Sequence, residues 1–146
     1  MSVVNTGNQE QMKEAIMSNI FEEINKKQKM FKTKPVNEDA IKEAEIKLGR
    51  AFSDEYKNYL LQFGAISFSS TELTGLNIEK YANVVDVTLK EIEINEEFPK
   101  DCIVLENIGV EGILILINSK DQVFEWKNNS AIKIHENMAE YLRTKL

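Results

Sequence analysis

The stretch IKEAEIKLGRAFSDEYKNYLLQFGAISFSSTELTGL, residues 41–76, decides the predicted fold. Apolar residues recur in it with helical spacing in two short runs, and Gly49 and Gly64 follow these runs. Asn37 and Ser53 precede the runs and can accept hydrogen bonds from the first-turn amides, as helix N-caps do. The pattern therefore predicts a helical hairpin in which both glycines adopt left-handed geometry and stop the helices.

Beyond Gly64 the periodicity changes to that of β-structure. Ile66 and Phe68 alternate with small or polar residues, and Leu73 and Leu76 flank a threonine and a glycine. Short strands are predicted here. Glu72 lies between these apolar positions, and two interpretations stay open: a buried, hydrogen-bonded structural carboxylate, or a residue of a functional site.

The pattern of apolar residues in the N-terminal part of the chain predicts one long amphipathic helix over residues 8–29. The lysine run that follows and Pro35 are expected to end this helix. Its apolar face is formed by Met12, Ile16, Ile20 and Ile24, supported by Met17 and Phe21.

The C-terminal part predicts a meander of strands over residues 102–105, 112–117 and 122–126, and a terminal helix from Ile134 through Met138, Tyr141 and Leu142. The valines at 84, 85 and 87 suggest a further strand, whereas residues 88–95 fit a strand or a short helix equally. The middle meander strand is apolar on both faces, so we expect helices to cover one face and the core the other.

The predicted fold class is α+β: N-terminal helices including a helical hairpin, a mainly antiparallel sheet of about five to six strands, and a C-terminal helix. The chain of 146 residues fits one domain over residues 1–146. Neither a membrane span nor a signal peptide is predicted, and we expect a cytoplasmic location. Cys102, the single cysteine, excludes an internal disulfide and is expected to be a buried thiol.

The composition argues against catalysis and against direct nucleic-acid binding. The net charge is −6, and Arg50 and Arg143 are the only arginines among 18 basic residues. His135 is the only histidine, so neither a metal site nor a nucleophile activated by histidine is predicted, and a capping or surface role is favoured for it. The spaced glycines at 109 and 112 indicate a tight turn rather than a phosphate-binding loop. We therefore expect no enzyme activity, no metal and no cofactor.

One segment concentrates the negative charge. From Asp86 to Glu111 the chain has eight acidic residues against two lysines, Lys90 and Lys100. A solvated surface is the simpler interpretation, and a surface for a basic partner is the functional one. The candidate acids are Asp86, Glu91, Glu93, Glu96, Glu97, Glu106 and Glu111. Trp126 is a further candidate, because an indole can anchor a partner, although packing is the commoner role of a lone tryptophan at a strand end.

The order and spacing of these elements resemble the SUKH superfamily, the Smi/Knr-like domains. The resemblance covers residues 37–146, and the N-terminal helix matches more weakly. Ser53 stands where the family commonly has proline, and a serine cap starts the same helix by another route. The residues that carry the resemblance are Ile41, Glu45, Leu48, Gly49, Phe52, Tyr56, Leu60, Phe63, Gly64, Glu72 and Gly75, followed by IVLENIGVEGILILINSKDQVFEWKNN and MAEYLRTKL.

For this family, the resemblance implies a bacterial immunity protein that binds and neutralises a cognate toxin domain, commonly a nuclease. Many such toxins carry a basic surface, which an acidic partner would complement. The fungal members of the family suggest an alternative, an intracellular regulatory adaptor that binds an endogenous protein. Fold analogy does not choose between the two roles, but the identity of the adjacent gene would. The sequence leaves the toxin's identity and the oligomeric state open.

Overall fold

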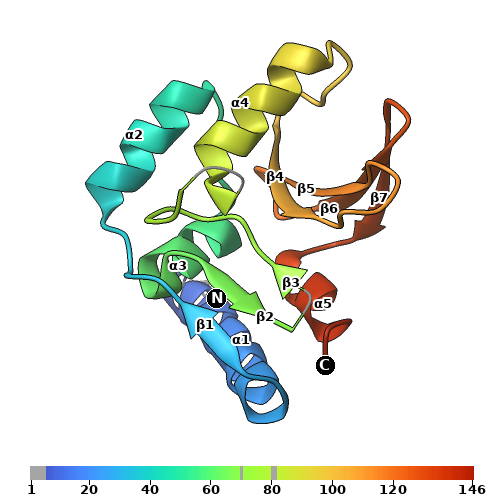
Figure 1. Cartoon of the computed structure of the whole chain (residues 1–146). Coiled ribbons are helices and arrows are strands. Elements are labelled where there is room, and N and C mark those ends of the chain that lie inside the picture. Colours follow the sequence, from blue (N-terminus) through green and yellow to red (C-terminus); the bar gives the residue numbers. More distant parts are fainter. Residues whose placement is uncertain (1–5, 70, 80–81) are drawn as a thin grey trace, which may run out of the picture.

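The computed structural model describes residues 6–69, 71–79 and 82–146, and the side chains of this part from residue 11 onward. The described part is an α+β domain with five helices and two antiparallel sheets, and one edge of the second sheet, at β7, is not covered by a helix (Figure 1). The elements are α1 (Thr6–Lys27), β1 (Met30–Lys32), α2 (Glu38–Leu48), α3 (Asp54–Phe63), β2 (Ile66–Phe68), β3 (Thr71–Glu72), α4 (Val84–Ile94), β4 (Cys102–Asn107), β5 (Leu114–Asn118), β6 (Val123–Lys127), β7 (Ser130–His135) and α5 (Met138–Arg143).

Helix α1 lies close to its predicted range, but its apolar face is longer than the core it covers. Met17, Ile20, Phe21 and Ile24 are buried, whereas Met12 and Ile16 are exposed, which corrects the expectation that both belong to the core face. The lysines that follow do not lead into a simple loop, because a short strand, β1, begins at Met30.

The helical hairpin is confirmed at both N-caps. The Asn37 side chain accepts a hydrogen bond from the amide of Ala40, and Ser53 accepts one from Tyr56. Gly49 ends α2 in the left-handed conformation, with φ 67° and ψ 26°.

Gly64 ends α3 differently from the prediction. Its φ is 76° but its ψ is −71°, and the amide of Ala65 donates to the carbonyl of Phe63 at 2.9 Å. These dihedrals and this bond describe a γ-turn rather than a left-handed helix cap. Helix α3 therefore turns through one residue directly into the approach to β2.

The strands form two sheets rather than one. The first has the order β1-β2-β3 and the second the order β4-β5-β6-β7. They adjoin where Leu73, just beyond β3, forms a bridge with Glu106 and the amide of Thr74 donates to the carbonyl of Leu105 at 2.9 Å. Leu73 and Leu76 therefore lie in an extended connection and not in regular strands.

Residues 84–94 form a helix, so the strand suggested by the three valines is wrong and the open alternative for residues 88–95 is settled. Asn83 caps α4 by accepting hydrogen bonds from Val85 at 2.9 Å and Asp86 at 3.2 Å. Thr88 is buried and its hydroxyl accepts the amide of Val104 at 3.0 Å, which fastens α4 to β4. The cap and this packing outweigh the strand preference of β-branched residues.

The second sheet has one strand more than the predicted meander. Residues Ser130–His135 form β7, so Ile134 belongs to a strand, and the terminal helix begins only at Met138. Asn128 and Asn129 have φ of 52° and 61°, the backbone that a two-residue hairpin turn requires.

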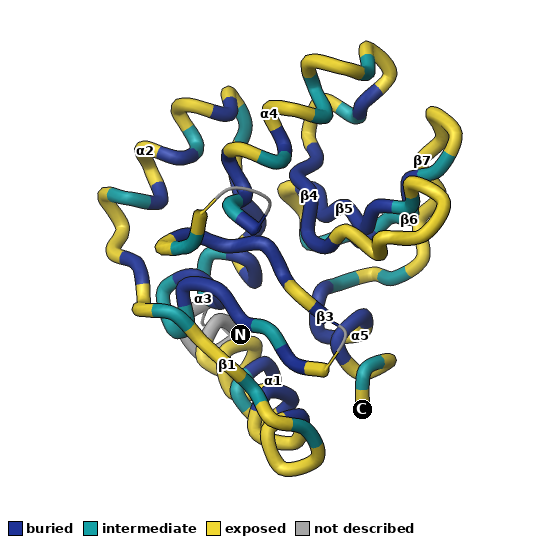
Figure 2. Tube along the Cα trace, in the orientation of Figure 1, coloured by how far each residue is buried: buried dark blue, intermediate teal, exposed yellow. Residues whose placement is uncertain are grey.

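Strand β5 lies between two clusters of buried side chains, as its two apolar faces predict (Figure 2). Ile115 and Ile117 belong to the larger cluster, shared with α1, α2, α3 and α5. Leu114 and Leu116 belong to the smaller one, to which Val87 and Ile92 of α4 pack. Its buried members are Phe98, Cys102, Val104, Leu114, Leu116 and Trp126.

Candidate functional site

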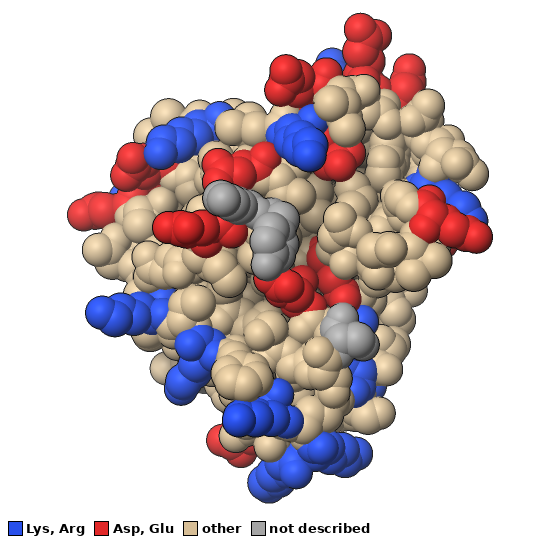
Figure 3. All heavy atoms as spheres, viewed as in Figure 1, with Lys and Arg blue, Asp and Glu red and all other residues tan. Residues whose placement is uncertain are grey.

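The acids of the predicted segment are distributed over α4, the loop after it, β4 and the turn after β4. Those on α4 and its loop form an exposed group, and Figure 3 shows acidic side chains gathered over this end of the molecule. The exposed members are Asp86, Glu93, Glu96 and Glu97, and Glu91 is partly buried.

Two large apolar side chains are exposed among these acids. Leu89 is 40 % exposed and Ile94 is 66 % exposed. Asp86, Leu89 and Glu93 follow one another at spacings of three and four residues, so they share one face of the helix. We call the group Asp86, Leu89, Lys90, Glu93, Ile94, Glu96 and Glu97 the α4 surface.

The loop at the end of the α4 surface is held by a side chain. The Asn95 carboxamide oxygen accepts the amide of Glu97 at 3.0 Å, and its nitrogen donates to Asn129 Oδ1 of the β6–β7 turn at 2.5 Å. These two bonds order the segment that carries Glu96 and Glu97. Partial burial raises the pKa of Glu91, an effect that the neighbouring Lys90 opposes.

Glu106 does not belong to any exposed surface, which corrects its place among the candidate acids. Glu106 is 3 % exposed, and its carboxylate accepts a hydrogen bond from the hydroxyl of Tyr141 and lies 3.2 Å from the ammonium of Lys145. The carboxylate therefore joins β4 to the C-terminal helix, and it cannot touch a partner in this conformation.

Trp126 is also buried, which confirms that it packs inside the protein. The alternative, that its indole anchors a partner, does not fit this position and is corrected. Its ring lies 5.7 Å from that of Phe98, edge to face, in the smaller cluster beneath α4. The tryptophan supports the loop after α4 from inside and presents no surface of its own.

Glu72 and Glu111 are exposed but belong to other elements. Glu72 lies on β3, so the interpretation of a buried structural carboxylate is wrong. It lines a shallow groove of about 190 Å³ whose wall includes Phe31 and Ile78. Glu111 lies in the turn between β4 and β5 and forms an ion pair with Lys127 at 2.8 Å. Among the candidate acids, the structure thus brings together those of α4 and the loop after it, and not Glu72 or Glu111.

The structure shows where the single histidine and the single cysteine of the chain lie. His135 lies 3.9 Å from the Glu140 carboxylate, and no group of three or more potential metal ligands occurs among the described residues. Cys102 is buried, and desolvation raises the pKa of its thiol to about 12, so it stays protonated and unreactive at neutral pH. No helix in the described part of the chain could span a membrane.

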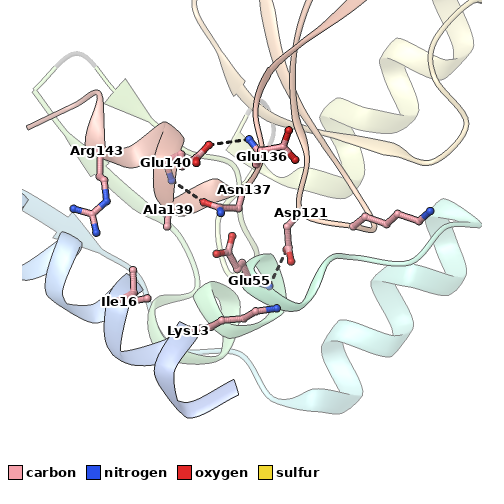
Figure 4. A pocket seen from close by; sticks show the side chains of 10 residues that line it. Lys13, Ile16, Glu55, Asp121, Glu136, Asn137, Ala139, Glu140 and Arg143 are labelled. Atoms are coloured by element: carbon pink, nitrogen blue, oxygen red, sulfur yellow. Dashed lines mark hydrogen bonds between the residues drawn. The ribbon is translucent and has the colours of Figure 1, made fainter. Parts of the chain in front are cut away.

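The structure also reveals a buried acid that the sequence analysis did not select. Glu55, in the first turn of α3, is 5 % exposed, and its Oε2 accepts the amide of Met138 at 2.9 Å. It lies at a cavity of about 380 Å³ that is also lined by Lys13, Asp121 and Arg143 (Figure 4). The signal was in the sequence, because Glu55 precedes Tyr59 by one helical turn on the buried stripe of α3.

The protonation of Glu55 should make stability depend on pH. Desolvation, and then the nearby Asp121, raise the pKa of this carboxyl to about 7 from an ordinary value of 4.5. The folded protein therefore binds the proton more tightly than the unfolded chain, so this contribution to stability is complete below pH 4.5 and is lost as the pH rises through 7. We expect Glu55→Gln to flatten the fall in thermal midpoint between pH 5 and 8, measured by circular dichroism.

The matched control for that measurement is Asp54→Asn, because Asp54 is exposed in the same helical turn. This variant should keep the pH dependence of the wild-type protein. A Glu55→Gln protein with an unchanged pH profile would show that another group is responsible.

The fold and its surfaces define a small α+β protein that presents an exposed acidic face on α4 and the loop after it. Residues 17–146 match the model of the family SUKH_5, described as SMI1-KNR4 cell-wall. The chain belongs to this family, and with it to the SUKH superfamily. A comparison with curated proteins gives no match. Membership is consistent with an immunity-protein role in general, and members of the family are typically not enzymes.

Proposed function

We propose that this chain is a cytoplasmic bacterial immunity protein that binds and neutralises a cognate toxin domain, a nuclease with a basic surface. Membership of the SUKH superfamily supports the role. The observation that carries the proposal further is the α4 surface, where four exposed acids and two exposed apolar side chains occur within twelve residues of the chain.

The α4 surface combines the two features that a protein-binding surface needs. The acids would attract a basic partner over a distance and raise the association rate. Leu89 and Ile94 would supply apolar area that is removed from water only in the complex. Lys90, within the same face, would favour partners that carry an acid at the matching position.

The surface is also held in place by hydrogen bonds at two points. Thr88 fastens α4 to β4, and Asn95 orders the following loop on the β6–β7 turn. Little conformational entropy would then be lost when the toxin binds, which favours affinity at a given contact area.

The proposal is tested by reversing Glu93, Glu96 and Glu97 together to lysine. These side chains are exposed, so the fold should persist, with each change worth less than about 0.5 kcal/mol. Association with the protein encoded by the adjacent gene should slow by about tenfold or more at low salt. Co-expression with that protein should no longer protect the cell.

The matched control is the reversal of Glu14, Glu22 and Glu23 of α1, which changes the net charge equally at another exposed site. It should retain protection and lose only a small part of the association rate. Equal losses in both triple variants would assign the effect to net charge and contradict a site on α4. A neighbouring gene that encodes no toxin would instead favour the regulatory adaptor.

A further inference from the structure

The outer edge of β7 is open in the described part of the chain. Strand β7 has β6 as its one ladder neighbour and lies at the end of the order β4-β5-β6-β7. Its residues from Ser130 to Ile134 are all exposed, and in Figure 1 nothing lies beyond it. An edge of this length offers unpaired backbone donors and acceptors to another strand.

The hairpin turn fixes which backbone groups of β7 point outward. Asn128 and Asn129 form a two-residue loop, so the flanking pair Lys127 and Ser130 exchanges both hydrogen bonds. The pattern alternates along an antiparallel ladder, and Ile132 therefore also directs its amide and carbonyl toward β6. The register of β6 and β7 shifts only beyond Lys133.

Ala131 and Lys133 consequently direct their amides and carbonyls away from the sheet. Two such edges can pair antiparallel about a two-fold axis at Ile132, so that Ala131 of each copy exchanges two hydrogen bonds with Lys133 of the other. Ile132 then faces its own counterpart in a non-hydrogen-bonded pair, where side chains approach most closely. This side chain is 61 % exposed in the single chain.

The residues on the edge favour this register over the two registers in which the axis is shifted by one residue. Shifting the axis to Lys133 would oppose two lysines, and shifting it to Ala131 would bring Asn129 of the turn opposite Lys133. The basic side chains near the edge are already balanced within the chain, since Lys133 pairs with Glu136 at 2.5 Å and Lys127 pairs with Glu111 at 2.8 Å. Two copies could therefore approach without strong repulsion, although the whole chain carries a net charge of −6.

We propose that two copies of this chain pair through their β7 edges, with Ile132 on the two-fold axis, to form a homodimer with one continuous sheet. Four strands from each copy make up this sheet, and β4 lies at its two far ends. The loop after α4 approaches this edge, since Asn95 bonds to Asn129 of the β6–β7 turn, whereas Asp86 lies toward the other end of α4.

The dimer is tested by sedimentation velocity over increasing protein concentration. The wild-type chain should shift from monomer to dimer. Ile132→Asp would oppose two carboxylates at the axis and should weaken the dimer by about tenfold or more. Ile94→Asp, a change at a comparably exposed isoleucine on α4, should leave the dimer unchanged.

A proline variant tests whether dimerisation depends on backbone hydrogen bonds of the β7 edge rather than on its side chains. Lys133→Pro removes an amide that points outward and that the β6 ladder does not use, so it should abolish the dimer and preserve the thermal midpoint. Lys133→Ala is its control and should remain dimeric. If the proline variant is destabilised, the comparison rests on Ile132→Cys instead, which should form a disulfide-linked dimer on mild oxidation, whereas Ala131→Cys should not.

A wild-type chain that remains monomeric up to about 1 mM, where even weak complexes form, would overturn the proposal and leave the edge to a different chain. A dimer that persists in Ile132→Asp with no cross-link through Ile132→Cys would also overturn it and place the interface elsewhere. Failure of the dimer would not affect the proposed toxin binding, which is read from the α4 variants.

Discussion

Replacing Gly64 with alanine is expected to destabilise the protein severely, by about 3 to 5 kcal/mol, because backbone strain and overlap with neighbouring atoms add together. Its φ of 76° and ψ of −71° suit few residues other than glycine. A Cβ at this position would overlap the carbonyl oxygen of Lys34 and would lie 2.5 Å from Thr33 Oγ1. The obstacle is backbone, so it cannot move aside as the end of a flexible side chain could.

The neighbourhood of Gly64 explains why so little room remains. The carbonyl of Gly64 accepts the amide of Leu76 at 3.1 Å, and a Cβ at Gly75 would overlap that same carbonyl oxygen. Gly64 and Gly75 thus allow three backbone segments to lie in contact where α3 leads into the first sheet. Glycine at both positions is therefore a packing requirement.

Gly49→Ala is the matched control, since Gly49 also has a positive φ but has no atom within 4 Å of its added Cβ. It should cost only the backbone strain, about 1 kcal/mol. Urea denaturation followed by circular dichroism measures both. Equal midpoints for the two variants would contradict the steric argument and reduce Gly64 to an ordinary helix stop.

Features set by local sequence could be predicted well. The caps at Asn37 and Ser53 and the stop at Gly49 depend on residues within one turn, and all three are present as expected. Gly64 was recognised as a helix stop, but its γ-turn was not, because the turn is imposed by the distant Lys34 and Gly75. Local pattern identifies the residue, and tertiary contacts decide its conformation.

Helix α4 and strand β7 show where local pattern failed. Three valines favoured a strand, but Asn83 caps a helix and Thr88 bonds to β4 across 16 residues of sequence. Strand β7 was missed because Ile134 precedes Met138, Tyr141 and Leu142 at helical spacing, although Ile132 and Ile134 also alternate with Lys133 and His135 as in a strand. Pairing with β6, and not the burial of its own side chains, defines it.

The candidate acids fall into an exposed group and a buried one, and tertiary contacts again decide which acid belongs to which group. Charge density along the chain located α4 and its loop, where Glu93 and Glu97 are exposed. It could not show that Glu106, in the same segment, points to the C-terminal helix, because Tyr141 and Lys145 lie more than 30 residues away. Glu55 escaped notice for the opposite reason, since an acid in a first helical turn is ordinary.

Removing the Glu106 carboxylate is expected to destabilise the fold by about 3 kcal/mol, because the variant Glu106→Ala leaves buried polar groups without their partner. Tyr141 would lose the acceptor of its hydroxyl, and Lys145 would lose the anion that it faces at 3.2 Å. Burial, and then Glu106, raise the pKa of Tyr141, so the tyrosine stays protonated and remains a donor at any working pH.

Two further variants separate hydrogen bonding from charge at this site. Glu106→Gln keeps an oxygen that can accept from Tyr141 but removes the charge, so we expect a smaller loss of about 1 kcal/mol. Tyr141→Phe tests the hydroxyl alone, and a double-mutant cycle with Glu106→Gln gives the coupling between the two side chains. Urea unfolding of the four proteins provides these free energies.

The same set tests whether Glu106 acts in binding or only in folding. Its buried carboxylate joins β4 to α5 and is out of reach of a partner, so folded Glu106→Gln should associate with the proposed partner at the wild-type rate. Glu93→Gln should behave in the opposite way, with unchanged stability and slower association at low salt. If Glu106→Gln slowed association while the free energy of unfolding stayed at the wild-type value, the partner would have to reach the junction of β4 and α5, and the binding surface would extend beyond α4.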